Sequence, residues 1–497
     1  MNPLKKLAGQ TAIYGLPTIL GRFLSYLLVF LQVRVFKKPD QFSVVPEFYA
    51  YVSFLFIILT YGMETAYFRF SLKQKENHSV YPTTLISILI STTVFIFLVL
   101  TFNQSIATSI GYPLHPEYVV WFGWILALDT LAAIPFAKLR IENKPVRFAF
   151  IKSLNIFTTI LLQIIFLFTI PWVLEHPQYK LFYTISDFVY SPKIGVGYIF
   201  ISNLIASVLT IIFLAPQYIL KNYTFDKKLW KEMFNYAWPL LILGLAGIVN
   251  ETFDRALMKW IIPPSENPQL QLGIYGVCYK ISILMTLFIT TFRFAAEPFF
   301  FSHASQSDSK QIYSNVMNWF MIVCSFIFLG VMLNIDIIKY LITSSYWPGL
   351  KIVPILLIAN MFLGIFYNLS IWYKLTDKTK LGAVVSIIGA AITIILNFLL
   401  VPIMGYMGAA WATLACYFTV MVISYILGQK YYPINYNLRK FFLYLGVALF
   451  LFALNHLLNQ HKIPFPIIIN NLFLIPLILL IIKVENINIK ALIQKLK

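Results

Sequence analysis

The chain contains 497 residues, of which 59% are hydrophobic and only 11% are charged, and it carries a formal net charge of +19. Soluble domains carry about 25% charged residues, so this composition excludes a soluble fold and predicts an integral membrane protein. Its long Leu, Ile and Phe runs do not alternate in polarity, which excludes a transmembrane β-barrel.

Apolar stretches long enough to cross a bilayer follow one another along the whole chain. A hydrocarbon core of about 30 Å requires roughly 20 apolar residues in a helix. Fourteen spans are predicted at residues 10–33, 43–68, 81–102, 118–137, 148–170, 196–219, 233–258, 272–298, 313–333, 351–373, 382–402, 408–428, 439–458 and 465–482. The predicted fold class is an all-α integral membrane protein with 14 transmembrane helices, arranged as two six-helix lobes related by a repeat plus two C-terminal helices.

The first predicted span carries Arg22 near its middle. An arginine at that depth costs about 2.5–3.5 kcal/mol on insertion scales, so it should face a cavity or an acidic partner. Two interpretations remain open: Arg22 lines a substrate cavity, or it forms a structural ion pair with Glu64 or Asp129.

Two acids of the first half lie in or against predicted spans. Glu64 ends the second span and Asp129 lies in the fourth. Acids within spans are rare and mark coupling sites, so both are predicted to act in coupling or gating. For Glu64 the alternative is a side chain that reaches the cytoplasmic surface.

The seventh predicted span ends in a polar cluster that runs from Asn250 to Arg255. Glu251 and Arg255 are spaced as an i,i+4 pair. Arg255 is predicted to bind substrate and Asp254 to act in coupling. A solvated helix end explains the cluster equally well.

The eighth predicted span carries Lys280 in its outer third and Arg293 and Glu297 near its inner end. Lys280 and Arg293 are predicted to bind substrate. Glu297 is followed by a proline and three phenylalanines, which resembles the sequence after Glu64, so the two acids are interpreted as equivalents in two repeats. A coupling role is predicted for Glu297, with a surface-reaching side chain as the alternative.

Three landmarks recur in the same order in both halves of the sequence. The matched pairs are Tyr14-Gly-Leu-Pro17 with Tyr236-Ala-Trp-Pro239, the KLRIENK loop at 138–144 with the KLTDKTK loop at 374–380, and Gly197-Tyr198 with Gly405-Tyr406. Their order favours a six-helix unit used twice, a common plan in secondary transporters. Chance matching of short motifs is the alternative. The predicted lobes are 1–220 and 221–430, followed by appended helices and a cytoplasmic tail at 431–497.

The basic residues of the loops predict the orientation, because Lys and Arg are retained on the cytoplasmic side. Of the 38 Lys and Arg residues, 25 fall on the side that holds the N-terminus, 9 on the opposite side and 4 in or beside spans. Both termini are therefore predicted to be cytoplasmic, in a multi-pass protein of the bacterial inner membrane. This bias accounts for most of the net charge, so no nucleic-acid partner is predicted.

The sequence lacks the common motifs of enzymes and metal sites. It contains no G-x-x-x-x-G-K-[ST] loop and no H-E-x-x-H helix. The three cysteines fall within predicted spans, where a free thiol behaves as a small apolar group. No catalytic residue, cofactor, metal or disulfide is predicted.

Three segments carry a resemblance to a known family. They are Asp254-Arg255 followed by Leu272-Gly-Ile-Tyr-Gly-Val-Cys-Tyr-Lys280, Gly405-Tyr-Met-Gly408-Ala-Ala-Trp411, and Tyr61-Gly-Met-Glu64-Thr-Ala-Tyr-Phe-Arg69. Together they resemble the polysaccharide-repeat-unit (O-antigen type) flippases of the multidrug/oligosaccharidyl-lipid/polysaccharide exporter superfamily. The resemblance implies two lobes that open alternately to either side, around a cationic cavity that holds the pyrophosphate and sugars of an undecaprenyl-linked oligosaccharide. Arg22 then matches the first-helix cation, and Arg255, Lys280 and Arg293 are the second-lobe candidates.

The function predicted from this sequence is flipping of a lipid-linked oligosaccharide for polysaccharide biosynthesis. The expected partners are that substrate, membrane lipids, a polysaccharide polymerase and glycosyltransferases. One alternative is an ion-coupled multidrug exporter of the same fold, although cationic drugs favour acidic sites. The other is a membrane glycosyltransferase or polymerase, although the longest outer loop, Pro171–Lys193, offers only Glu175, His176 and Asp187 as catalytic candidates.

Overall fold

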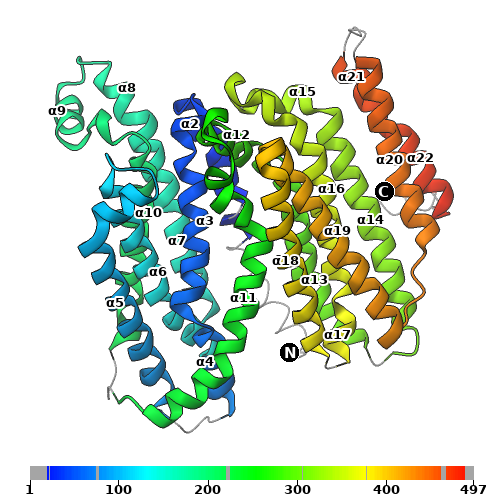
Figure 1. Ribbon diagram of the computed structural model, residues 1–497, viewed down its shortest axis with the longest axis horizontal. Coiled ribbons are helices and arrows are strands. Elements are labelled where there is room, and N and C mark those ends of the chain that lie inside the picture. Colours follow the sequence, from blue (N-terminus) through cyan, green and yellow to red (C-terminus); the bar gives the residue numbers. More distant parts are fainter. Residues whose placement is uncertain are drawn as a thin grey trace, which may run out of the picture. The chain divides into compact units, whose positions relative to one another are not determined.

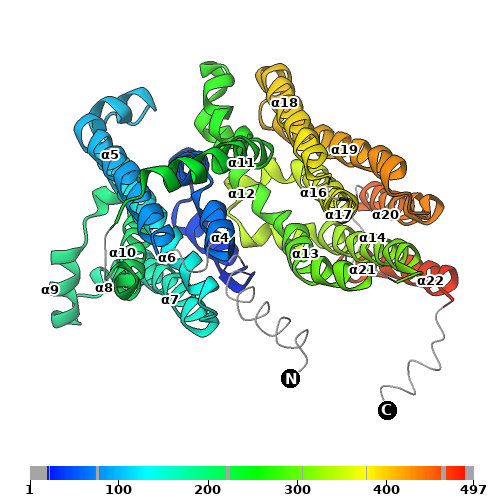
Figure 2. The ribbon, with the colours of Figure 1, turned by 90° about the horizontal axis from the view of Figure 1, so that it is seen from below.

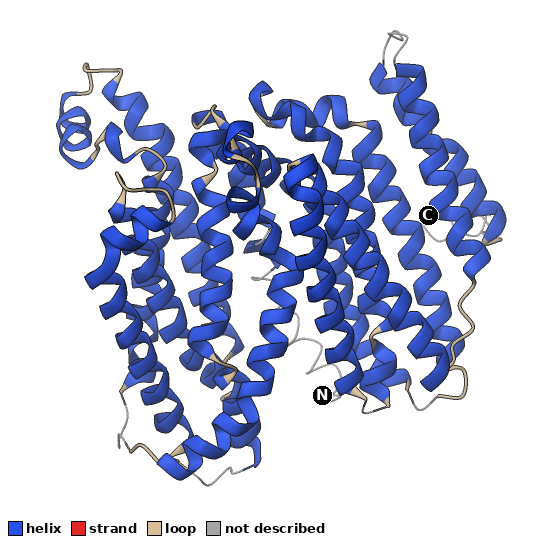
Figure 3. Cartoon of the chain, viewed as in Figure 1, coloured by secondary structure: helices blue, strands red, loops and turns tan. Residues whose placement is uncertain are grey.

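The computed structural model describes residues 19–21, 23–73, 78–219, 224–304, 306–376, 378–459 and 466–486. Within these ranges the chain forms helices joined by short loops, without a strand (Figure 3). Contacts divide it into two compact units, Met1–Gly273 and Ile274–Lys497. Each unit is described separately below (Figure 1).

The first unit contains a helical segment over residues 19–35, described without residue 22. The elements that follow it are α2 (Pro39–Phe42), α3 (Val44–Thr60), α4 (Met63–Lys73), α5 (Val80–Ser109), α6 (Pro116–Ile141), α7 (Pro145–Ile164), the π-helical turn η1 (Ile165–Thr169), α8 (Ile170–Leu174), α9 (Lys180–Val189), η2 (Pro192–Ile194), α10 (Gly197–Tyr218), α11 (Lys227–Ile261), η3 (Pro264–Glu266) and the start of α12 (Pro268–Ile281). In this unit α6, α7 and α10 pack side by side (Figure 2).

The second unit contains the end of α12 and a series of long helices. They are α13 (Ile283–His303), α14 (Ser309–Leu333), α15 (Ile335–Ile338), η4 (Lys339–Leu341), η5 (Ser344–Ile352), α16 (Val353–Leu369), α17 (Ile371–Leu375), α18 (Thr379–Met404), α19 (Tyr406–Tyr431), α20 (Leu438–Asn459), α21 (Pro466–Leu472) and α22 (Leu474–Val484).

Twelve helices in the described part of the chain are long and apolar enough to cross a membrane, and Ile469–Val484 is a shorter apolar helix. These thirteen segments correspond to predicted spans two to fourteen, and residues 10–18 and 22 of the first predicted span lie outside the described residues. The all-α membrane fold class is therefore confirmed, and the predicted number of 14 helices is consistent with it.

The eighth predicted span differs in detail, because the chain breaks between α12 and α13. The Ser282 hydroxyl donates to the Tyr279 carbonyl at 2.7 Å, and Ser282 has a ψ angle of −9°. A serine that bonds its local backbone competes with the helix in this way. The sequence shows neither glycine nor proline at this point, so the break could not be predicted.

Helix α11 is held against the first unit along its length. The Leu229 backbone N–H donates to the Asp226 carboxylate at 3.0 Å, which caps the helix start. Met233 and Ala237 then pack in a buried cluster with Met63 and other residues of α4 and α5. By contacts, α11 belongs to the first unit, and the unit boundary lies at Gly273. The predicted lobe boundary at residue 220 is based on the sequence repeat, whereas the unit boundary is based on contacts. The lobe boundary therefore stays a prediction.

Two glycines, Gly62 and Gly408, lie where another part of the backbone comes too close to leave room for a side chain. Gly62 has a φ of +73°, and a Cβ atom there would lie 2.7 Å from the Ala237 carbonyl oxygen. Gly408 lies where a Cβ atom would be 2.4 Å from the Leu400 carbonyl oxygen. These glycines therefore set how closely α4 meets α11 and how closely α19 meets α18.

Candidate functional site

Two of the predicted site residues cannot be placed. Arg22 lies outside the described residues, and so does the side chain of Glu297, although its backbone belongs to α13. The alternatives for Arg22 and the role of Glu297 therefore stay predictions.

Arg255 lies beside an acid on α11. Its Nε atom is 3.3 Å from the Asp254 Oδ1 atom, and its guanidinium also donates to the Glu251 carbonyl. The Asp254 carboxylate is buried and accepts a further bond from the Arg255 backbone N–H at 2.7 Å. The positive charge of Arg255 is thus balanced locally. Lys280, the next predicted cation, is half-buried on α12.

Glu64 forms an ion pair with Arg140 of α6, whose guanidinium also lies over the Phe68 ring at 4.7 Å. Both charged side chains are about one-third exposed. The sequence did not single out Arg140, because it lies in a basic loop that orientation alone explains.

Asp129 lies in a polar network inside the first unit. The Ser207 hydroxyl of α10 donates to its carboxylate at 2.8 Å, and Lys152 of α7 interacts with it electrostatically. Nearby, the Asn203 side-chain amide donates to the Tyr49 hydroxyl. Asp129 is thus surrounded by polar groups from three other helices, which suits either a structural or a coupling role.

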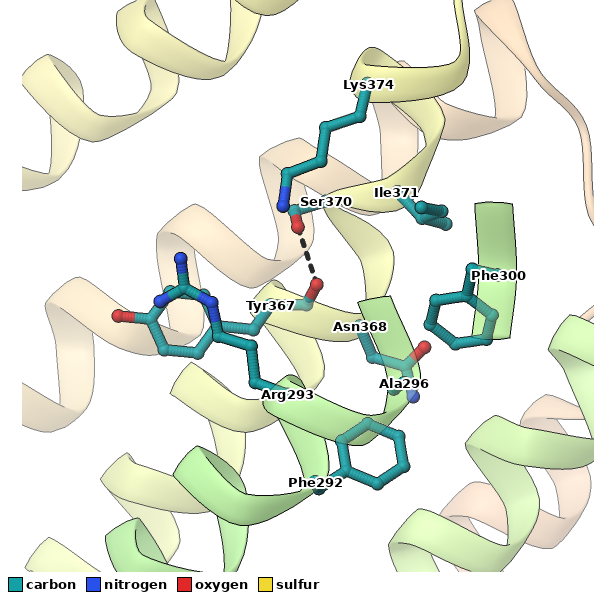
Figure 4. Close-up of a pocket in the computed structure, with 9 residues that line it drawn as sticks. All are labelled: Phe292, Arg293, Ala296, Phe300, Tyr367, Asn368, Ser370, Ile371 and Lys374. Carbon is teal, nitrogen blue, oxygen red and sulfur yellow. Dashed lines mark hydrogen bonds between the residues drawn. The ribbon is translucent and has the colours of Figure 1, made fainter. Parts of the chain in front are cut away.

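A basic and aromatic pocket lies in the second unit, between α13 and the α16–α17 segment (Figure 4). It is a small cavity of about 20 Å³, room for about one water molecule, at the base of an open depression of about 310 Å³. Its walls consist of Phe292, Arg293, Ala296, Phe300, Tyr367, Asn368, Ser370, Ile371 and Lys374. Of the predicted site residues whose side chains the structure describes, Arg293 alone lines it.

The polar groups of this pocket are arranged for an anion. The Arg293 guanidinium lies over the Tyr367 ring at 4.6 Å, and Lys374 is close enough to interact with the Arg293 charge. Asn368 is buried, and its Nδ2 atom has no hydrogen-bond partner within the described part of the chain. The Ser370 hydroxyl donates a hydrogen bond to the Tyr367 carbonyl at 2.6 Å (Figure 4). Two cations and an unsatisfied amide N–H are the groups that a phosphate oxygen binds.

The composition of this pocket was only partly predictable. No acidic side chain lines it among the described residues. Lys374 was assigned to a cytoplasmic loop, whereas the structure extends α17 through it. Tyr367 and Asn368 lie in an apolar span without a sequence signal of their own. The spacing of Tyr367, Ser370 and Lys374 along one helical face was the one available clue.

The most buried ion pair of the described residues was not predicted. Lys259 of α11 lies 3.2 Å from Glu47 of α3, which is completely buried, and also donates to the Ile110 carbonyl at 2.5 Å. The hydroxyls of Tyr51 and Tyr112 donate to the same carboxylate at 2.9 and 2.5 Å. Burial and the nearby Glu47 charge raise the pKa of Tyr112, so this tyrosine stays a proton donor. The cluster is fully bonded and has no free group for a ligand.

No group of three or more His, Cys, Asp or Glu side chains suited to a metal ion occurs in the described ranges. The recurring apolar helices of the described chain define a multi-pass membrane protein. Residues 7–303 match the polysaccharide biosynthesis protein family, and the chain belongs to that family. No curated protein matches the sequence.

Solved structures with the same fold are transporters. The lipid II flippase MurJ in an inward closed conformation superposes with a TM-score of 0.70 at 16% identity, over 93% of this chain and 96% of that one. An inward-facing multidrug resistance MATE family transporter of the MOP superfamily gives a TM-score of 0.62 at 14% identity, over 84% and 94%. An outward-facing MATE family transporter gives 0.60 at 13%, over 85% and 95%. At these identities the likeness establishes the fold.

Proposed function

We propose that the protein is a flippase that moves undecaprenyl-pyrophosphate-linked oligosaccharide repeat units across the bacterial inner membrane for polysaccharide biosynthesis. Membership of the polysaccharide biosynthesis family and the fold of a lipid II flippase support a transporter of lipid-linked substrates. The observation that carries the proposal is the pocket of Arg293 and Lys374, which brings two cations together beside an aromatic face.

The pyrophosphate is the part of the substrate that this pocket suits. Two like charges held close together repel each other, and a bound phosphate removes that repulsion. Arginine adds a planar fork that can bond two phosphate oxygens at once. The unsatisfied Asn368 amide supplies a further donor. The half-buried Tyr367 ring offers an aromatic surface for an adjoining sugar.

The remaining candidate residues belong to the same proposal. Arg22, Arg255 and Lys280 are proposed to contact the phosphate at other stages of an alternating-access cycle. Glu64, Asp129, Asp254 and Glu297 are proposed to act in coupling or gating. Both termini are proposed to be cytoplasmic, with the polymerase and glycosyltransferases of the same biosynthesis as partners.

The test is transport of a pyrophosphate-linked oligosaccharide lipid by the full chain in vesicles, measured as sugar that becomes accessible on the opposite face. The double variant Arg293→Ala, Lys374→Ala should lose most of the translocation rate. Lys310→Ala is the matched control, because it removes an exposed cation of the neighbouring α14, outside the pocket. Unchanged translocation by the double variant would exclude the pocket from the mechanism.

The MATE-like fold favours one second candidate, an ion-coupled multidrug exporter. The two functions differ in the charge of the substrate. A cationic drug is repelled by the Arg293–Lys374 pocket, whereas a pyrophosphate lipid is attracted. Export of cationic dyes by the wild-type chain, without flipping of the oligosaccharide lipid, would favour the exporter.

A further inference from the structure

Helix α9 has the opposite orientation from an amphipathic helix on a soluble protein. Its apolar residues recur at the spacing of one helical face. They are Leu181, Phe182, Ile185, Phe188 and Val189, and all five are at least half exposed. The polar residue Ser186 is instead buried, at 6% exposed, while Phe188 is 91% exposed. The helix therefore contacts the protein through its polar side and turns its apolar side outward.

The position of α9 relates this apolar face to a membrane. The helix follows α7, η1 and α8, which together form the candidate membrane span Pro145–Leu174. Figures 1 and 2 both show α9 beside α8 at the edge of the first unit. Phe157 and Leu161 of α7 are also exposed, so the apolar surface of this span leads toward α9.

An aromatic stack marks the level at which this span ends. The Trp172 ring lies 4.3 Å from the His176 ring and 5.6 Å from the Tyr179 ring, measured between centroids. Both Trp172 and Tyr179 are about half exposed. Tryptophan and tyrosine are enriched where hydrocarbon meets lipid headgroups. The chain thus reaches the membrane surface at the residue before α9 begins.

We propose that α9 is an interfacial helix that lies in the plane of the bilayer and inserts its apolar face between lipid headgroups and acyl chains. Such helices combine an apolar face with a polar one and bind through the buried apolar area. The partner is a lipid surface, because α9 follows directly on a candidate membrane span with exposed apolar side chains and begins after the aromatic stack. By the predicted orientation this is the outer surface. The inference depends on the membrane fold alone and is independent of the transported substrate.

The test compares two spin-labelled positions on opposite sides of the helix, in the full chain reconstituted in phosphatidylethanolamine and phosphatidylglycerol vesicles. Ile185→Cys and Asp187→Cys are both exposed positions outside the packed core. The native thiols Cys278, Cys324 and Cys416 are buried, and the labelled wild type measures their background. The label at 185 should collide several-fold more often with oxygen than with a water-soluble nickel complex, and the label at 187 should show the reverse.

Two other results would overturn the proposal. If both labels are open to the nickel complex, α9 projects into water. If the label at 185 is shielded from both reagents in vesicles and in detergent alike, a protein surface or a second copy covers the face. A fluorophore at Phe188→Cys adds a measure of depth. Brominated lipids should quench it most when the bromine lies near the headgroup end of the acyl chain, and equal quenching by deep and shallow bromines would contradict interfacial placement.

Discussion

The Glu47–Lys259 cluster of the first unit and the Arg293–Lys374 pocket of the second show opposite uses of charge within membrane helices. In the first, Lys259 meets a buried carboxylate that Tyr112 also bonds, so every charge is satisfied by the protein. In the second, two cations lie together beside a buried amide that has no partner in the described part of the chain. A bonded ion pair stabilises the fold, whereas two like charges beside a buried amide donor are suited to an anionic ligand. The comparison predicts that substitutions in the first affect stability and those in the second affect binding.

The largest expected effect is loss of stability in Lys259→Ala. Removing one partner of a buried pair leaves an uncompensated charge and costs about 3–5 kcal/mol. The measurement is the unfolding free energy in detergent. A double variant Glu47→Gln, Lys259→Met should recover part of the loss, because no charge is left buried. Equal stability of the wild type and Lys259→Ala would contradict the role assigned to the pair.

Arg293→Ala should change binding and leave stability nearly unaltered. A hydrogen bond to a charged group contributes about 1.5–3 kcal/mol, which corresponds to about a tenfold to hundredfold loss of affinity. The measurement is binding of a pyrophosphate-linked lipid, with the thermal unfolding midpoint recorded in parallel. Arg293→Lys keeps the charge but not the planar fork and should retain an intermediate affinity. A lower unfolding midpoint with unchanged affinity would mean that Arg293 stabilises the fold and does not bind the substrate.

Gly62→Ala tests the close approach of α4 to α11, on which the first unit depends. A left-handed conformation costs an alanine about 1–2 kcal/mol, and the new Cβ atom would also contact the Ala237 carbonyl. The matched control is Gly247→Ala on α11, where no atom lies within 4 Å of the new Cβ. The control should keep or raise the unfolding free energy, because alanine favours a helix. An equal change in unfolding free energy in both variants would show that the left-handed backbone of Gly62 and its close approach to Ala237 are not the cause.

The smallest expected effect is a loss of stability at acidic pH in the contact between α20 and the end of α22. Burial opposes ionisation of Glu485, but bonds from Lys440 at 2.8 Å and from Tyr444 outweigh it, so the pKa of Glu485 lies below its usual value. A depressed pKa stabilises the contact above the unfolded-state pKa of about 4.5, and this stabilisation is lost as the pH falls through the folded-state value. The protection of the α22 amides, measured as the exchange rate relative to the intrinsic rate at the same pH, should therefore fall at acidic pH.

The control for this contact is Glu485→Gln, which cannot titrate. Its α22 amides should already have the lower protection at neutral pH and show little further loss on acidification. A loss of protection of equal size in the wild type and the variant would mean that another group causes the pH dependence.

Prediction from the sequence succeeded where the signal is local. The apolar spans depend on the composition of about twenty consecutive residues, and twelve of them appear as long helices in the described chain. The spacing of Glu251 and Arg255 predicts an i,i+4 pair; in the structure Arg255 donates to the Glu251 carbonyl and forms an ion pair with its neighbour Asp254. The break at Ser282 was missed, because serine is common within helices and its bond to Tyr279 depends on one side-chain conformation.

Prediction failed where partners are distant in sequence. Glu47 and Lys259 are separated by 212 positions, and nothing near either residue indicates the other. Lys259 and Lys374 each follow a long apolar stretch, so the sequence pattern alone places them in loops rather than in a cluster. The pairing of Glu64 with Arg140 was missed for the same reason.

Local composition is enough to identify a helical membrane protein and the approximate course of its helices, because the transfer free energy of apolar side chains into lipid adds up residue by residue along the chain. The pairing of charges from different helices follows from tertiary packing, because Coulomb and hydrogen-bond interactions depend on distances of a few ångströms. Helix α9 combines both lessons. Its amphipathic spacing is written in the sequence, but only the packing shows that its apolar side faces away from the protein.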